Sequence, residues 1–227
     1  MIKLSKRLQA IANYIEDENK IIDIGCDHAY LSIYLALNKK NIKVIASDIN
    51  QNAYNIALNN VKKEKLENII TLRLGNGLEV VSKDEIDTII ISGLGSMTIV
   101  GILKNGIDKL ANVKTIIIQS NTDLYYLRKN ITKLNYYIAK EETIKENGQY
   151  YTIIVFKKGN HHYSNDDLLF GPLSLKKDDQ NFKNMTLENY QKLKKINENI
   201  SSSKIIIKTK MYLKIKKVKK ILKRLSS

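Results

Sequence analysis

Five short apolar runs alternate with stretches that have helical periodicity over the first 134 residues. A near-continuous run of Ile, Val and Leu is typical of a strand buried on both faces of a sheet. The predicted strands are Lys20–Ile24, Ile42–Ser47, Ile69–Leu74, Asp87–Ser92 and Val113–Gln119. The predicted helices between and after them lie near residues 28–38, 51–62, 97–109 and 122–134, and an amphipathic helix with Leu4, Leu8, Ile11, Ala12 and Ile15 on one face precedes them. Such alternation predicts an α/β fold with a parallel sheet.

Two further apolar runs follow, and they are predicted to form a hairpin. Tyr136–Thr143 and Tyr150–Phe156 are separated by a stretch that contains Asn147-Gly148. Asn-Gly between two strands is a strong signal for a tight antiparallel turn. The prediction is therefore a mostly parallel seven-stranded sheet that ends in an antiparallel hairpin, which is the Rossmann-like layout of class I methyltransferases.

The C-terminal region is predicted to form two helices, separated by a turn at Ser201-Ser202-Ser203. The apolar face of the first consists of Leu187, Tyr190, Leu193, Ile196 and Ile200. The second has an a/d seam made of Met211, Ile215, Val218, Leu222 and Leu225. We expect a helical coiled-coil hairpin and divide the chain into residues 1–159, the sheet domain, and residues 160–227, the helical domain.

The net charge of +15, with a pI near 9.6, predicts a polyanionic partner. Of the 38 Lys and Arg, 16 lie after residue 159, together with only 6 of the 23 Asp and Glu, so most of the excess is in the helical domain. The single cysteine rules out an intrachain disulfide, and four clustered zinc ligands are not expected. We therefore expect no metal. Because no signal segment or membrane span is recognisable, we also expect a cytoplasmic protein with no membrane association.

The end of the first predicted strand has the residues of a ligand-binding loop. Asp23-Ile24-Gly25-Cys26-Asp27-His28 lies where open α/β sheets bind ligands, and Gly25 allows close approach of the backbone. The glycines of a dinucleotide fingerprint are absent. Asp23 and Asp27 would repel a pyrophosphate but suit a cation. S-Adenosylmethionine carries an ammonium and a sulfonium, so it is the predicted cofactor, with S-adenosylhomocysteine as its product.

The next three strand ends supply the other parts of this predicted site. Asp48, with Ile49 beside it, ends the second strand at a distance that suits hydrogen bonds to ribose hydroxyls. Gly75-Asn76-Gly77 ends the third, where Asn76 can bond an adenine edge. The small-residue loop Gly93–Met97 ends the fourth and is where the transferable methyl group would lie. Taken singly, an Asp can be a helix cap, Asn76 a turn residue and His28 a helix-start residue; the four loops in order favour a cofactor site.

These stretches resemble bacterial tRNA (adenine-22-N1)-methyltransferases. The matching segments are Asp23–Leu31, Ser47–Asn50, Leu74–Leu78, Ser92–Met97, Gln119–Asn121 and Phe170-Gly171-Pro172-Leu173. The chain departs from the family pattern at Asn76, where the family usually has Asp, at Ser32 and Ser120, where proline is common, and at Ser96, where glycine is common. The resemblance implies methyl transfer to N1 of adenine 22 in tRNA.

Adenine N1 has a free lone pair once the base is unpaired, so positioning rather than base catalysis is expected. Asp27 is the candidate to stabilise the cationic product or orient the amine. Tyr30 and Tyr151 are candidates to stack on the base, and Asn121 to bond its edge. For each tyrosine, packing in the core is an equally good interpretation.

The last predicted helix has the charge pattern of a phosphate-binding surface. From Lys204 to Arg224 there are ten Lys or Arg and no acid. The candidate RNA contacts are Lys208, Lys216, Lys219, Lys220, Lys223 and Arg224. An anionic membrane surface and a merely solvated helix face are the alternatives for this segment.

Two other functions remain open from the sequence. One is a methyltransferase acting on another amine in RNA, DNA or protein, against which the lack of an Asn/Asp-Pro-Pro-Tyr segment counts. The other is a non-enzymatic RNA-binding module, against which the intact acids Asp23 and Asp48 count. We expect a monomer.

Overall fold

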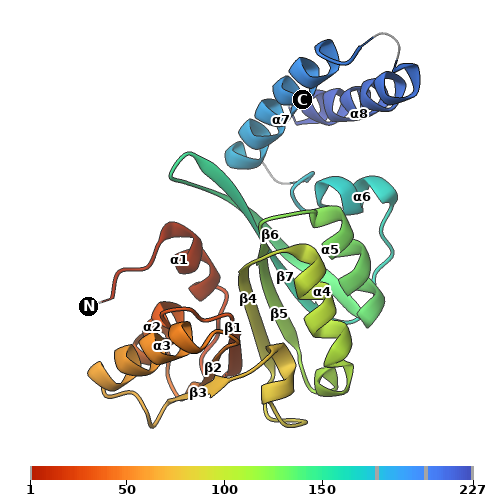
Figure 1. Ribbon diagram of the computed structural model, residues 1–227. Coiled ribbons are helices and arrows are strands. Elements are labelled where there is room, and N and C mark those ends of the chain that lie inside the picture. The colour runs from red at the N-terminus through yellow and green to blue at the C-terminus, as the bar shows by residue number, and fades with distance from the viewer. Residues whose placement is uncertain (1, 177–178, 202–203, 226–227) are drawn as a thin grey trace.

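The computed structural model describes residues 2–176, 179–201 and 204–225. Its centre is a seven-stranded sheet with the order β3-β2-β1-β4-β5-β7-β6 (Figure 1). The strands are β1 Lys20–Ile24, β2 Lys43–Asp48, β3 Ile70–Leu74, β4 Thr88–Leu94, β5 Thr115–Ser120, β6 Tyr136–Glu146 and β7 Gln149–Lys158. The first five are parallel, and β7 is antiparallel to both β5 and β6. The predicted mostly parallel, seven-stranded Rossmann-like sheet is confirmed.

Helices cover both faces of the sheet because its central strands are apolar on both sides. The helices of the sheet domain are α1 Lys6–Ala12, α2 Tyr30–Asn38, α3 Gln51–Lys63, α4 Ser96–Asn105 and α5 Leu124–Ile131, with short 3-10 turns η1 Gly77–Val80, η2 Ile107–Leu110 and η3 Thr132–Leu134. One apolar cluster joins Ile21 to α1, α2 and α3, and a second joins Ile22 to α4 and α5. Adjacent residues of β1 therefore belong to opposite cores, as strand geometry requires. The helix predicted near 97–109 is shorter, because it ends at Gly106 and η2 follows.

The β6–β7 hairpin is longer than predicted, because only Asn147 and Gly148 form its turn. Both have positive φ, 49° and 79°, as a two-residue hairpin turn needs. The register of β6 shifts between Ile138 and Lys140, so Ala139 is an extra residue opposite β7. Since β6 runs parallel to β5, the turn lies at the same edge of the sheet as the carboxyl ends of the parallel strands.

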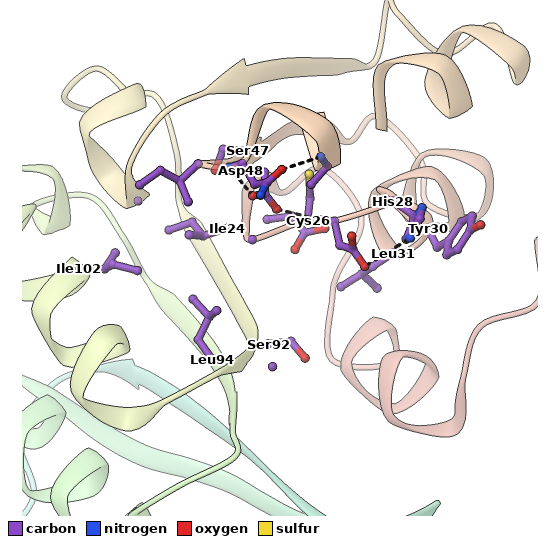
Figure 2. Close-up of a pocket in the computed structure, with 18 of the residues that line it drawn as sticks. Ile24, Cys26, His28, Tyr30, Leu31, Ser47, Asp48, Ser92, Leu94 and Ile102 are labelled. Carbon is purple, nitrogen blue, oxygen red and sulfur yellow. Dashed lines mark hydrogen bonds and ion pairs between the residues drawn. The ribbon is translucent and has the colours of Figure 1, made fainter. Parts of the chain in front are cut away.

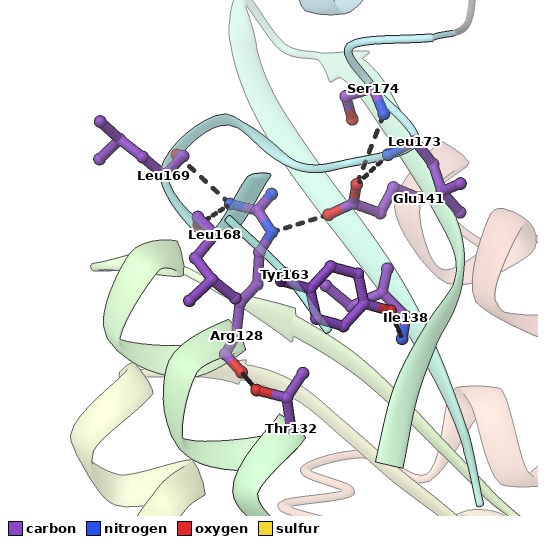
Figure 3. Close-up of polar contacts among 9 residues, drawn as sticks. All are labelled: Arg128, Thr132, Ile138, Glu141, Tyr163, Leu168, Leu169, Leu173 and Ser174. Carbon is purple, nitrogen blue, oxygen red and sulfur yellow. Dashed lines mark hydrogen bonds and ion pairs between the residues drawn. The ribbon is translucent and has the colours of Figure 1, made fainter. Parts of the chain in front are cut away.

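A buried ion pair fastens the segment after β7 to the sheet domain (Figure 3). Arg128 Nε donates to Glu141 Oε1 at 2.7 Å, and both side chains are inaccessible. The remaining groups of the pair bind the backbone of α6 Asn165–Phe170 and of the segment that follows it. Arg128 Nη1 donates to the Leu168 carbonyl, and Glu141 Oε2 accepts from the Leu173 N–H at 3.1 Å. Residues 160–176 thus pack on the sheet domain, while the division at 159/160 remains a prediction.

The last two helices, α7 Gln180–Glu198 and α8 Ile205–Arg224, pack against each other as predicted. Of the five residues predicted for the seam of α8, Val218 is buried and the other four are half-buried, and Ile221, which the prediction left out, is buried as well. The predicted face of α7 is wrong in part: Leu187 and Ile196 are exposed, and Phe182 is buried against Leu175 and Ile221 instead. Of the predicted turn at residues 201–203, Ser202 and Ser203 lie outside the described residues.

The base of α7 is attached to the projecting part of the β6–β7 hairpin. Asp179 Oδ2 accepts from the Thr143 N–H at 3.1 Å, and Asn181 Nδ2 donates to the Thr143 carbonyl at 2.9 Å. Farther along α7, Glu188 accepts from the Tyr150 hydroxyl. These contacts place the helical hairpin at the edge of the sheet where the parallel strands end.

Candidate functional site: a cofactor cavity at the carboxyl edge of the sheet

The loops that follow β1, β2, β3 and β4 surround one cavity of about 770 Å³ (Figure 2). Most of the predicted cofactor residues line it: Asp23, Gly25, Asp27, His28, Asp48, Ile49, Gly75, Asn76, Gly77 and Gly93. A cavity of this size suits a small-molecule ligand. The sheet topology thus brings together residues that are up to 70 positions apart in the chain, as the order of the strand ends predicted.

Gly25 shapes the turn that leaves β1. Its φ is +72°, a conformation that favours glycine. A Cβ at this position would lie 3.8 Å from the Leu94 side chain, across the gap between the β1 and β4 loops. The missing side chain therefore keeps that gap open. The Gly25 and Cys26 N–H groups both donate to the Ser47 carbonyl, which fixes the turn to β2.

Asp23 is a buried acid with no cationic side chain paired to it among the described residues. Its Oδ2 accepts from the Ser32 hydroxyl at 2.7 Å. Burial, helped by the nearby Asp48 charge and opposed by the Ser32 hydrogen bond, raises the pKa of Asp23 to about 6. A cation placed in the cavity would stabilise the ionised form.

Asp48 uses both carboxylate oxygens to organise the loops. Oδ2 accepts from the Asp27 N–H at 3.1 Å and Oδ1 from the Asn50 N–H at 2.9 Å. Beside it, Ile49 is 70% exposed, so an apolar side chain stands at the cavity without a packing partner. The neighbouring Ser47 Oγ is buried and has no hydrogen-bond partner in the described structure. A flat apolar group with polar edges matches these surroundings.

Two aromatic rings lie together at the start of α2. The His28 and Tyr30 rings stack with centroids 5.4 Å apart and an angle of 12° between their planes. His28 Nε2 is 3.6 Å from Asp27 Oδ2. Tyr30 is 45% exposed and lines the cavity, so its outer face is available to a planar ligand.

The loop after β3 is built around two glycines. A Cβ on Gly75 would lie only 2.4 Å from a Val80 methyl group, so only glycine fits there. Gly77 has φ +55°. Asn76 between them is exposed, and its amide nitrogen donates to Glu79 at 3.1 Å, which leaves its Oδ1 for a ligand.

The end of β4 is held by side chains from the end of β5 and from the residue that follows it. Gln119 Oε1 accepts from the Gly93 N–H at 3.1 Å, and Asn121 Nδ2 donates to the Gly93 carbonyl at 2.8 Å. Asn121 thus holds the loop and does not line the cavity. Met97 is 75% exposed and is also absent from the lining, where Thr98 and Ile102 stand instead.

Arg7 of α1 belongs to the cavity wall, and the sequence did not suggest it. Its Nη1 donates to Gln119 Oε1 at 2.6 Å and to Ser92 Oγ at 2.9 Å. Its guanidinium lies 5.4 Å from the centroid of the Tyr151 ring. Tyr151, predicted to stack on the base, thus packs against Arg7. The amphipathic pattern of α1 could place its apolar residues but could not reveal the role of a charged one.

The predicted RNA contacts on α8 are mostly exposed. Lys216, Lys219, Lys220 and Lys223 are exposed, and Lys208 is half-buried. Arg224 is exposed but close to Asp167 of α6: the Ser164 hydrogen bond lowers the pKa of Asp167 most, and the Arg224 charge lowers it further. Lys217 lies 3.6 Å from Asp166. Lys217 and Arg224 of α8 are therefore directed at α6, and the charges of Lys216, Lys219, Lys220 and Lys223 are exposed to solvent.

The side chains that line the cavity fit S-adenosylmethionine. They are a buried acid without a cation, a second acid at the β2 end, an exposed apolar side chain and an amide, with a gap that Gly25 leaves open.

In the described part of the chain, no three His, Cys, Asp or Glu side chains are grouped so that they could hold a metal ion, and no helix is long and apolar enough to cross a membrane.

A family model for tRNA (adenine(22)-N(1))-methyltransferase, TrmK, matches residues 21–223. The chain belongs to the TrmK family. The resemblance seen in the sequence is thereby confirmed. The tRNA (adenine(22)-N(1))-methyltransferase of Bacillus subtilis is 35% identical over 94% of this chain and 92% of its own.

Solved structures of TrmK relatives share the whole fold. TrmK of M. capricolum, in complex with S-adenosyl-homocysteine, has a TM-score of 0.87 and 37% identity over 98% of this chain and 99% of its own. Sp1610 of Streptococcus pneumoniae, in complex with S-adenosyl-L-methionine, has a TM-score of 0.90 and 30% identity over 97% of this chain and 100% of its own. The similarity includes the helical hairpin as well as the sheet domain.

Proposed function

We propose that this chain transfers the methyl group of S-adenosylmethionine to N1 of adenine 22 in tRNA. The observation that carries the proposal is the cavity at the carboxyl edge of the sheet, lined by Asp23, Asp27 and Asp48, in a chain of the TrmK family. When bound, the cofactor supplies an electrophilic methyl group on a sulfonium. The adenine N1 lone pair forms the new N–C bond, the S–C bond electrons return to sulfur, and the base becomes cationic with no proton lost.

The residues of the cavity have distinct roles in this proposal. Asp23 attracts the ammonium of the amino-acid end, because its ionised form is otherwise buried without a partner. Asp48 accepts from the ribose hydroxyls, Ile49 packs on the adenine ring of the cofactor, and Asn76 Oδ1 accepts from its amino group. Asp27 and Tyr30 line the cavity with exposed side chains, so in this proposal they meet the target base and its developing positive charge.

The helical hairpin binds tRNA phosphates in this proposal, and its position supports that. α7 is fastened to the part of the β6–β7 hairpin that projects past the end of β5, at the edge where the cavity opens. The exposed lysines of α8 can therefore hold a polyanion while one of its bases reaches the cavity. Lysines in such a role contribute affinity without reading sequence.

The deciding experiment uses labelled S-adenosylmethionine and unmodified tRNA, followed by mapping of the modified nucleoside. We expect 1-methyladenosine at position 22 and no transfer to tRNA that has another base at that position. Label in another nucleoside would contradict the proposed position. Binding of tRNA without any transfer would instead favour a non-enzymatic RNA-binding module.

A charge-removal variant tests the role of α8 in the intact chain. Replacing Lys216, Lys219, Lys220 and Lys223 by Gln should weaken tRNA binding and reduce the slope of log affinity against log salt by about three to four. Affinity for S-adenosylhomocysteine should stay the same. The matched control is Lys62→Gln with Lys63→Gln on α3, also exposed. Equal tRNA affinity in both variants would reject this role.

A further inference from the structure

Arg7 is a charged side chain from the first helix that reaches the last residues of β4. It contacts residues 85 and 112 positions away in the chain, Ser92 and Gln119. Its place follows from the seating of α1: Ser5 caps the helix through the Leu8 N–H, and Ile11 and Ala12 are buried in the core. Because α1 is fixed by this cap and by its buried residues, the position of Arg7 relative to the sheet is fixed as well.

Gln119 is the residue through which Arg7 acts on the loop. Gln119 is fully buried at the end of β5, and its Oε1 accepts from both Arg7 and the Gly93 N–H. Its Nε2 donates to Asn121 Oδ1 at 3.0 Å, and Asn121 Nδ2 donates to the Gly93 carbonyl. Gly93 is therefore held at both its N–H and its carbonyl by one continuous network.

Arg7 and the Gly93 N–H together fix the orientation of the Gln119 amide, because both donate to its oxygen. An amide can exchange the places of its oxygen and nitrogen by rotation, and an arginine has donors only, so it requires the oxygen to face it. In the rotated state Nε2 would face the Gly93 N–H, and two donors would confront each other in a buried place. Gly93, at φ +86°, is in a conformation that few other residues adopt, so its loop relies on these hydrogen bonds.

We propose that Arg7 is a positioning residue for methyl transfer: with the Gly93 N–H it fixes the Gln119 amide, which holds Gly93 and the turn from β4 into α4 against the methyl group. Tyr151 also supports the guanidinium, since its ring lies within cation–π range. Helix α1 is therefore part of the active site. The proposal rests on the proposed function, because it assigns this loop to the transfer step.

The main test is Arg7→Ala, measured at saturating tRNA and cofactor. We expect kcat to fall about 10- to 100-fold, because small displacements at a reacting centre have effects of this size. The Kd for S-adenosylhomocysteine should change less than threefold, since the β1, β2 and β3 loops are unchanged. Exogenous guanidinium should restore part of the rate, and Arg7→Lys should be intermediate. The control is Lys6→Ala, one position earlier. In the described structure the Lys6 ammonium group makes no hydrogen bond or ion pair, so this variant should behave as wild type.

Coupling to Gln119 separates positioning from a general loss of packing. The double variant Arg7→Ala with Gln119→Leu should lose about as much kcat as Gln119→Leu alone, because both act through one network. Multiplied losses, a wild-type kcat in Arg7→Ala, or a parallel loss of S-adenosylhomocysteine affinity would each overturn the proposal.

A measurement without turnover keeps this inference distinct from the proposed function. Amide hydrogen exchange in residues 93–97 should accelerate at least tenfold in Arg7→Ala and stay unchanged in Lys6→Ala. If the wild-type chain transferred no methyl group to tRNA, the proposed function would fail while faster exchange would still support the link from Arg7 to the loop. Unchanged exchange would reject that link.

Discussion

Asp23 and Glu141 are both buried acids, and they have opposite surroundings. Glu141 is paired with Arg128 and accepts from the Leu173 backbone (Figure 3). Asp23 has one hydroxyl donor, Ser32, and burial raises its pKa to about 6. Glu141 is satisfied by the chain itself, and Asp23 is left to be satisfied by something else.

The difference distinguishes an acid that holds the fold from an acid that holds a ligand. Removing a partner from a satisfied buried charge leaves that charge exposed to an apolar interior, which is costly. Removing the charge of an unsatisfied acid relieves the apo protein and harms only the ligand-bound state. Substitutions at the two sites should therefore have opposite effects on stability.

The largest effect is expected for Arg128→Leu. It leaves Glu141 buried without its cation and removes a donor from the Leu168 carbonyl. The free energy of unfolding should fall by about 3 to 5 kcal/mol, which lowers Tm by on the order of 10 °C for a chain of this size. The control Lys129→Leu, at the adjacent exposed position of α5, should change Tm little. A loss below about 1 kcal/mol in urea unfolding would contradict the contrast.

Asp23→Asn should weaken cofactor binding without weakening the fold. A charge-assisted hydrogen bond is lost, so the Kd for S-adenosylhomocysteine should rise roughly 10- to 100-fold. The apo protein at pH 7.5 should be as stable as wild type or more stable, because the buried charge is gone. Calorimetric titration and thermal unfolding of the same preparation give both values. A destabilised apo protein with unchanged affinity would reverse the roles of the two acids.

A smaller effect is expected from pH. The folded-state pKa of Asp23 lies above its ordinary value of 3.8, so the apo fold binds the extra proton between about pH 4 and 6. Through Asp23, apo stability should decline as pH rises across that window and level off above it. Affinity for S-adenosylhomocysteine should change the other way, falling at most tenfold per unit as pH drops below 6. In Asp23→Asn this part of the slope should vanish; a slope that persists would assign it to another group.

Much of the fold and of the cavity could be predicted because each depends on short-range patterns. The bounds of β1 were predicted to the residue, and the other strands to within three. Asp23, Asp48 and Asn76 were found because they follow strand ends, and parallel strands bring their carboxyl ends to one edge. The order of the strands along the chain was sufficient to predict that these three residues lie together.

The parts that sequence reasoning missed depend on side chains that meet across long distances. Arg7 is a polar residue on an amphipathic helix, and its contacts with Gln119 come only from packing. Met97 follows a strand end like the other residues, but it is the second residue of α4 and does not line the cavity, where Thr98 and Ile102 stand. The Phe170–Leu173 segment supported the family resemblance, and the structure supplies its reason: a Cβ on Gly171 would lie 2.6 Å from the Glu141 carboxylate.

The extra residue Ala139 in β6 decides which face of the sheet each later side chain of that strand occupies. Before the bulge, even-numbered side chains such as Tyr136 and Ile138 face α5; after it, odd-numbered Glu141 faces that side. Glu142 is consequently on the α1 side, where it accepts from Tyr14. Deleting Ala139 would move the side chains of β6 that follow it to the opposite face of the sheet. One inserted residue thus decides which acid meets Arg128, and with it where the helical hairpin is attached.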